Sequence, residues 1–99
     1  MEKRTPHCKL RVVKQMVTEG LCEATITALG TAREMGLGFS DMKRELLRLE
    51  APSFYKSMTT HADHRLWQDV YRHTLESGLK AYVKLTVHEG VLIVSFKEL

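Results

Sequence analysis

The hydrophobic pattern of the chain changes at Pro52, and this change constrains the fold more than any other feature of the sequence. Before Pro52, apolar residues recur every three or four positions, which is the spacing of one buried helix face. After Pro52 the period falls to two, and β-branched and aromatic residues become frequent, as in strands. The 99 residues suit a single domain, residues 1–99, with one core. We therefore expect an α+β fold, with N-terminal helices packed on one face of a C-terminal antiparallel β-sheet.

Three helices are expected before Pro52. Their approximate ranges are Leu10–Gly20, Thr25–Met35 and Ser40–Ala51. Glycines end the first two helices, and Ser40 is a good N-cap for the third. The side chains expected to face the core are Leu10, Val13, Met16, Val17, Ala24, Ala28, Leu29, Ala32, Met35, Met42, Leu46 and Leu49. Residues 1–8 are polar and should form an extended segment or an edge strand.

Four strands are expected after Pro52, and they should form an antiparallel meander. Their ranges are Phe54–Thr60, Leu66–Arg72, Ala81–His88 and Val91–Lys97, joined by turns at residues 61–64, 76–78 and 89–90. In the first hairpin we expect Lys56 and Gln68 to be cross-strand partners, with the loop centred on Ala62.

The register of the last hairpin can be predicted from its pattern. If Glu89-Gly90 is a two-residue loop, Val83 faces Phe96 on the apolar side. Tyr82 then faces Lys97 on the opposite side. A three-residue loop would mix apolar and polar side chains on both faces, because a slip of one residue exchanges the two faces. We therefore expect the two-residue register, with a phenol beside an ammonium on the face away from the helices.

That face should carry a cluster of cations and a phenol. Its members are Lys56, Arg72, Tyr82, Lys84 and Lys97. One interpretation is a site for a polyanion, and the alternative is a solvated surface on which lysines discourage edge pairing. The formal net charge of +3 favours polyanionic partners only slightly.

The loop at residues 61–64 contains two histidines, three positions apart, with an aspartate between them. Without further ligands at suitable spacing, we expect a solvated polar loop and no metal site. Trp67 is expected to anchor the core rather than to form a platform on which RNA bases stack.

Cys8 and Cys22 are isolated from each other and from spaced histidines, so we expect reduced thiols. The amino terminus lacks the apolar segment of a signal peptide, and no run approaches the roughly 20 apolar residues of a membrane span. We expect a cytoplasmic protein without membrane association.

Five blocks of the sequence resemble the motility quorum-sensing regulator (MqsR) toxin family. They are residues 1–7, Phe54–Thr60, Asp63-His64, Trp67–Arg72 and Val91–Glu98, in the order and spacing of the family. The resemblance covers essentially the full length, with a looser match over residues 21–50. It implies a RelE-like fold and a type II toxin that cleaves mRNA without the ribosome, with a preference for GCU-type triplets. It also implies inhibition by a zinc-containing MqsA antitoxin. The toxin would then contact DNA only indirectly, as part of the complex with that antitoxin.

The resemblance also assigns a site. The family's proposed catalytic quartet falls on Lys56, Gln68, Tyr82 and Lys97, and positions near its cleft, which are candidates for RNA contacts, fall on Tyr55, Met58 and Arg72. The pairing of Tyr82 with Lys97 follows independently from the hairpin register. One extra residue precedes Tyr82, and His73-Thr74 replaces the family's Pro-Arg, which changes the local RNA contacts.

Metal-free RNA cleavage uses the ribose 2′-hydroxyl as an internal nucleophile and needs no cofactor. It requires a base for that hydroxyl, cations for the phosphorane and an acid for the leaving 5′-oxygen. We expect Lys56 or Tyr82 to be the base, because crowded cations should lower the pKa of each lysine. Lys97 and Arg72 would hold the phosphorane charge, and Gln68 would orient the nucleotide or Tyr82. The alternative function is a basic RNA-binding or transcription-regulator partner module without nuclease activity.

Overall fold

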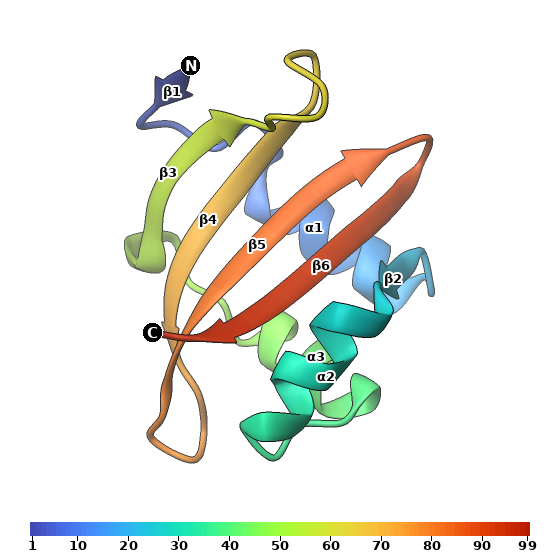
Figure 1. The fold of residues 1–99 in the computed structure, drawn as a ribbon, viewed down its shortest axis with the longest axis vertical. Helices are drawn as coiled ribbons and strands as arrows, with labels where there is room; N and C mark the ends of the chain where they lie inside the picture. The colour runs from blue at the N-terminus through green and yellow to red at the C-terminus, as the bar shows by residue number, and fades with distance from the viewer.

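A computed structural model describes residues 1–99 and has the expected α+β architecture. Its elements are β1 (Glu2–Lys3), α1 (Leu10–Thr18), β2 (Cys22–Ala24), α2 (Ile26–Glu34), α3 (Phe39–Leu47), η1 (Ala51–Ser53), β3 (Phe54–Thr59), β4 (Trp67–Thr74), β5 (Lys80–His88) and β6 (Val91–Glu98). The strands form one sheet in the order β1-β3-β4-β5-β6-β2. Figure 1 shows the helices behind and to the right of the sheet, so its other side, called here the open face, is uncovered.

The three helices lie close to their expected ranges, but α3 both starts and ends earlier than expected, with its end at Leu47 instead of Ala51. Ala24, expected on the second helix, lies in β2. The hydroxyl of Thr25 accepts the N–H of Ala28 at 3.1 Å and so caps α2. The expected cap Ser40 is wrong, because the N-cap of α3 is Gly38, two residues earlier, and the helix begins at Phe39. The Gly38 N–H donates to the Asp41 carboxylate at 2.8 Å, which satisfies a terminal backbone donor without a serine.

Two short strands extend the sheet at its edges. The predicted edge strand within residues 1–8 is confirmed as β1, which pairs antiparallel with β3. The strand β2 was not predicted from the sequence, and it pairs parallel with β6, with Cys22 opposite Leu92. Three residues between two helices give no alternating pattern, so nothing in the sequence marks β2.

The last hairpin has the predicted register. Val83 pairs with Phe96 and Tyr82 pairs with Lys97. The loop residues Glu89 and Gly90 have φ values of 51° and 78°, as a two-residue turn of type I′ requires at both positions.

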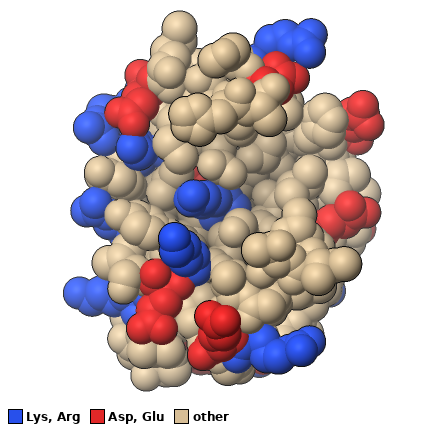
Figure 2. All heavy atoms as spheres, viewed as in Figure 1, with Lys and Arg blue, Asp and Glu red and all other residues tan.

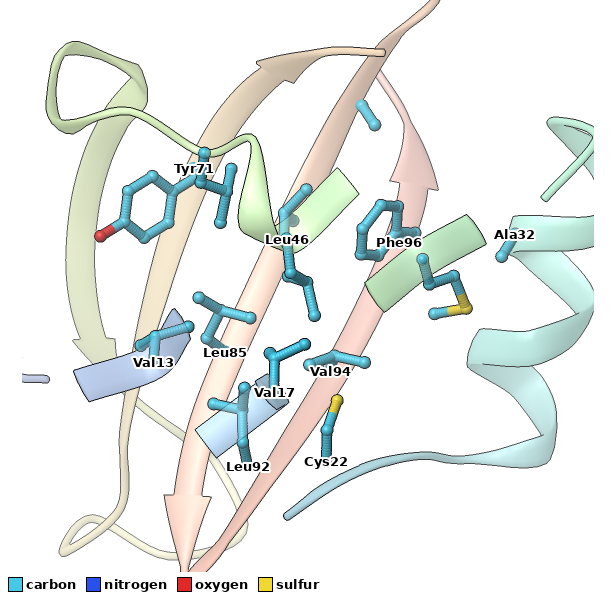
Figure 3. Packing of buried hydrophobic residues seen from close by; sticks show 14 of the residues in the cluster. Val13, Val17, Cys22, Ala32, Leu46, Tyr71, Leu85, Leu92, Val94 and Phe96 are labelled. Carbon is cyan, nitrogen blue, oxygen red and sulfur yellow. The ribbon is translucent and has the colours of Figure 1, made fainter. Parts of the chain in front are cut away.

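The core fills the space between the helices and the covered face of the sheet. Figure 3 shows side chains of α1, α3 and the last hairpin pointing toward one another. Val13, Leu46, Val83 and Phe96 are all fully buried there. The expectation for Trp67 is wrong, because its half-buried ring lies outside this core cluster.

The N-terminal segment is fastened across β4 by one buried carboxylate. Asp69 accepts the backbone N–H groups of His7 and Cys8 at 3.0 and 2.9 Å and the hydroxyl of Ser57 at 2.6 Å. The same segment covers Trp67, whose ring stacks on that of His7 with centroids 5.6 Å apart. This fastening holds the first residues of the chain beside β3.

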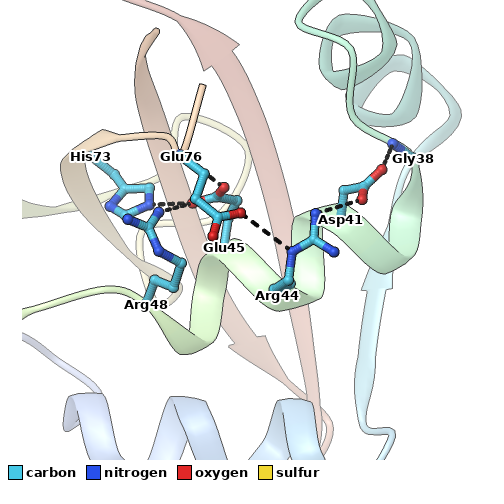
Figure 4. Close-up of polar contacts among 7 residues, drawn as sticks. All are labelled: Gly38, Asp41, Arg44, Glu45, Arg48, His73 and Glu76. Atoms are coloured by element: carbon cyan, nitrogen blue, oxygen red, sulfur yellow. Dashed lines mark hydrogen bonds and ion pairs between the residues drawn. The ribbon is translucent and has the colours of Figure 1, made fainter. Parts of the chain in front are cut away.

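A second buried carboxylate joins α3 to the end of β4 (Figure 4). Glu45 lies 2.8 Å from Nε2 of His73, accepts the backbone N–H of Glu76 at 3.1 Å and pairs with Arg48. Burial alone would raise the pKa of Glu45, but these hydrogen bonds outweigh it and hold the pKa below its usual value. The network fixes the strand end that carries Arg72.

No helix of the structure is long and apolar enough to cross a membrane. Cys8 and Cys22 are both free, as expected, and burial raises the pKa of each thiol.

Candidate active site

A β-bulge in β3 places two consecutive side chains on the open face. Phe54 pairs with Tyr71, and the register then shifts so that Lys56 pairs with Val70. The residue between them, Tyr55, has no partner in the ladder and faces the same pocket as Lys56. A regular strand would send one of these two side chains toward the helices. The bulge therefore brings a phenol and an ammonium together.

The strand registers set the remaining side chains of the open face in rows of cross-strand partners. One row consists of Lys56, Val70, Lys84 and Ser95, and the next consists of Arg72, Tyr82 and Lys97. A pocket of about 260 Å³, called here the central pocket, lies over these rows. Its lining residues are Tyr55, Lys56, Met58, Val70, Tyr82, Lys84 and Lys97. Figure 2 shows basic side chains near the middle and along the left of this face, with acidic ones nearer its rim.

Arg72 stands next to the central pocket and stacks on its phenols. Its Cζ lies 3.7 Å from the ring centroid of Tyr55 and 5.8 Å from that of Tyr82. The two tyrosine rings are 6.5 Å apart. Such stacking orients the guanidinium while leaving its N–H groups free to donate.

The cations of the site differ in their partners. Seven ion pairs occur in the structure, and none involves Arg72, Lys84 or Lys97. Lys56, in contrast, donates to Oε1 of Glu2 in β1 at 2.5 Å. That hydrogen bond raises the pKa of Lys56 above its ordinary value near 10.5. The expectation that crowding lowers this pKa is therefore wrong, because a carboxylate outweighs the neighbouring cations.

Gln68 lies apart from the rest of the predicted quartet. It pairs with Met58 rather than with Lys56, so the first hairpin is not centred on Ala62 as expected. The Thr60 N–H donates to the carbonyl of Leu66 at 3.0 Å, which closes the loop around residue 63 instead. Gln68 is on the open face, two residues along β4 from Val70, and does not line the central pocket.

Six of the seven predicted site residues are thus brought together, either lining the central pocket or, for Arg72, beside it. Sequence reasoning missed Glu2 as a neighbour of Lys56. An acidic residue in a predicted edge strand was the available signal, but the pairing of that strand with β3 was not predicted. Tyr71 belongs to the core and not to the open face, and burial, reinforced by Asp69, raises its pKa to about 12.

The loop at residues 61–64 is polar and partly solvated. Asp63 is engaged by Arg65, whose Nε lies 3.1 Å from Oδ1, and this hydrogen bonding lowers the pKa of the carboxyl. His61 and His64 are exposed. The structure contains no group of three or more His, Cys, Asp or Glu side chains placed to hold a metal ion.

Comparison with known proteins gives two matches. The model of the family described as "Motility quorum-sensing regulator, toxin of MqsA" matches residues 5–98. The protein named "mRNA interferase toxin MqsR" of Escherichia coli (strain K12) is 52% identical over 98 residues, which cover 99% of this chain and 99% of that protein. Both matches span the β-bulge and the central pocket. The chain therefore belongs to the family of motility quorum-sensing regulators that are toxins of MqsA.

Proposed function

We propose that this protein is the toxin of a type II toxin–antitoxin system and an endoribonuclease that cleaves mRNA. The observation that carries the proposal is the row of Arg72, Tyr82 and Lys97 beside Lys56 and Lys84. Of the four cations, only Lys56 has a carboxylate partner, so Arg72, Lys84 and Lys97 are available to a phosphodiester. The family membership and the mRNA interferase from Escherichia coli support the same activity.

The chemistry we propose is an internal transesterification. The ribose 2′-oxygen attacks the adjacent phosphorus and loses its proton, while the bond from phosphorus to the 5′-oxygen breaks and that oxygen gains a proton. Lys56 is suited to supply the second proton, because Glu2 keeps it an ammonium. Tyr82, in its phenolate form, is then the candidate acceptor of the first proton and becomes a neutral phenol. Lys97, Lys84 and Arg72 stabilise the phosphorane charge.

Gln68 has a different role in this scheme. Its amide cannot titrate, and it lies beyond the central pocket next to Met58. We propose that Gln68 and Met58 contact a base next to the cleaved bond, with Tyr55 as a stacking partner for another base. These contacts would carry the preference for GCU-type triplets.

We propose that the partner is a zinc-containing MqsA-like antitoxin, and that the toxin meets DNA only within that complex. An mRNA substrate supports a cytoplasmic location for the toxin. No cofactor is required by the proposed chemistry, and the protein acts as a single domain spanning residues 1–99.

The test is cleavage of a defined RNA by the purified protein, with the fragment ends mapped. We expect fragments with 2′,3′-cyclic phosphate and 5′-hydroxyl ends, formed equally well in EDTA. Activity that is lost in chelator and restored by a divalent ion would overturn the proposed mechanism. Intact RNA, together with harmless expression in cells lacking the neighbouring gene, would favour the RNA-binding module instead.

A further inference from the structure

The open face continues past the central pocket into a second depression. Two residues beyond the row that contains Arg72, Thr74 of β4 pairs with Lys80 of β5. This depression, called here the flanking hollow, has a volume of about 280 Å³. Its lining residues are Arg72, His73, Thr74, Lys80 and Leu99. Because a strand rises about 3.3 Å per residue, the two rows lie roughly 6.6 Å apart.

The charges around the flanking hollow suit an anion. None of its lining side chains is acidic, so the only negative group on the lining residues is the α-carboxylate of Leu99. Neither Arg72 nor Lys80 belongs to any ion pair. The acid of the adjacent loop, Glu76, is turned to the helix side, where its Oε2 lies 3.8 Å from Nε of Arg44 (Figure 4). Lys80 is exposed, so its ammonium is accessible to a ligand.

We propose that the flanking hollow binds a phosphate of the RNA strand next to the one that is cleaved. In this arrangement Lys80 is the cation of the subsite, the hydroxyl of Thr74 is an additional donor, and Arg72 stands between the two phosphates. The inference rests on the proposed function, since it takes the central pocket as the place of the cleaved bond. The two depressions lie next to each other on one face, with Arg72 beside one and lining the other, which favours RNA because one strand can then occupy both.

The subsite makes a residue-specific prediction about affinity and its salt dependence. Each phosphate contact to a single strand contributes about 0.7 to the slope of log K against log salt. Lys80→Ala should lower that slope by about 0.7 and weaken binding about two- to tenfold at low salt. Lys80→Arg should retain both, because the guanidinium also binds phosphate.

The experiment uses the full chain and an oligoribonucleotide made uncleavable by a 2′-deoxy sugar at the cleaved position. Fluorescence anisotropy at several salt concentrations gives Kd for the wild type, Lys80→Ala, Lys80→Arg and the charge-matched control Lys14→Ala. Lys14 lies on α1, away from the open face, and makes no ion pair. A neutral methylphosphonate is then placed at each flanking position in turn. At one position it should weaken wild-type binding without weakening Lys80→Ala further.

Each result bears on one proposal or the other. If Lys80→Ala binds RNA like Lys14→Ala, the subsite is wrong, even when the wild type cleaves the unmodified RNA. If the wild type binds with the predicted dependence on Lys80 but cleaves nothing, the subsite stands and the nuclease is wrong. If Lys80→Ala weakens binding of the antitoxin and leaves RNA binding unchanged, the hollow belongs to a protein interface and the subsite is wrong.

Discussion

At the scale of single residues, the cations of the open face fall into two groups. Lys56 is held by the carboxylate of Glu2, whereas Lys84 and Lys97 have no acidic partner. A lysine held by a carboxylate stays protonated, which suits an acid, and a lysine without one is available to a phosphate.

Lys97→Ala and Tyr82→Phe should each lower the cleavage rate by about 10²-fold or more, because each removes a group aimed at the reacting phosphate. Both residues stand on the open face, so the free energy of unfolding should change by no more than about 0.5 kcal/mol. Single-turnover cleavage and thermal melts measure the two effects. A stable Lys97→Ala protein with full activity would remove that lysine from the mechanism.

Glu2→Gln should move the alkaline limb of the pH–rate profile to lower pH. Glu2 raises the pKa of Lys56, so the wild-type ammonium persists to higher pH than it does without the carboxylate. The matched control is Glu34→Gln, which changes an exposed acid on α2 and should leave the profile in place. Faster cleavage by Glu2→Gln at neutral pH would instead identify Lys56 as the base.

At the scale of elements, each strand of the last hairpin separates chemistry from packing by its alternation. Val94 of β6 is 1% exposed and belongs to the core. Lys97, three residues further along the same strand, lies on the open face beside Tyr82. Substitutions on the two sides of one strand should therefore have different consequences.

Val94→Ala should destabilise the protein by about 1–3 kcal/mol, because the lost methyl groups leave a cavity in a packed core. The cleavage rate of the folded fraction should be nearly that of the wild type, since Val94 does not reach the open face. Urea unfolding and cleavage below the melting temperature test this. A large loss of rate with normal stability would contradict the separation of the two faces.

The last hairpin could be predicted from the sequence because apolar and polar residues alternate without a break on both sides of a two-residue loop. The first hairpin could not, because Asp63 and Arg65 order a longer loop and the bulge after Phe54 interrupts the alternation. The strand β2 could not be predicted because its three residues are too few to show an alternating pattern. The same bulge explains why the sequence pattern could not show how Tyr55 reaches the open face.

At the scale of the whole molecule, two buried carboxylates tie segments that are distant in sequence. Asp69 holds the N-terminal segment on β4, and Glu45 holds α3 against the end of the same strand. In both cases hydrogen bonds from protein groups replace those that water would make to the carboxylate.

The stability contributed by Glu45 should depend on pH. Its folded pKa lies below the ordinary value of 4.5, so the contribution is fully present above pH 4.5 and is lost as pH falls through the folded pKa. Glu45→Gln should cost about 1–3 kcal/mol near pH 7, from weaker hydrogen bonds. The difference from the wild type should shrink in acid, which denaturant titrations at several pH values would reveal. A difference that is constant down to pH 3 would exclude this role.

The bulge at Tyr55 has a genetic consequence. A ladder with one surplus residue becomes regular when that residue is deleted, and Phe54 and Lys56 would then still pair with Tyr71 and Val70. Loss of one codon would thus remove the ring on which Arg72 stacks while preserving the reading frame and the core. Cells that escape growth arrest by this route would carry a folded, harmless protein, which could still occupy the antitoxin and leave other copies of the toxin free.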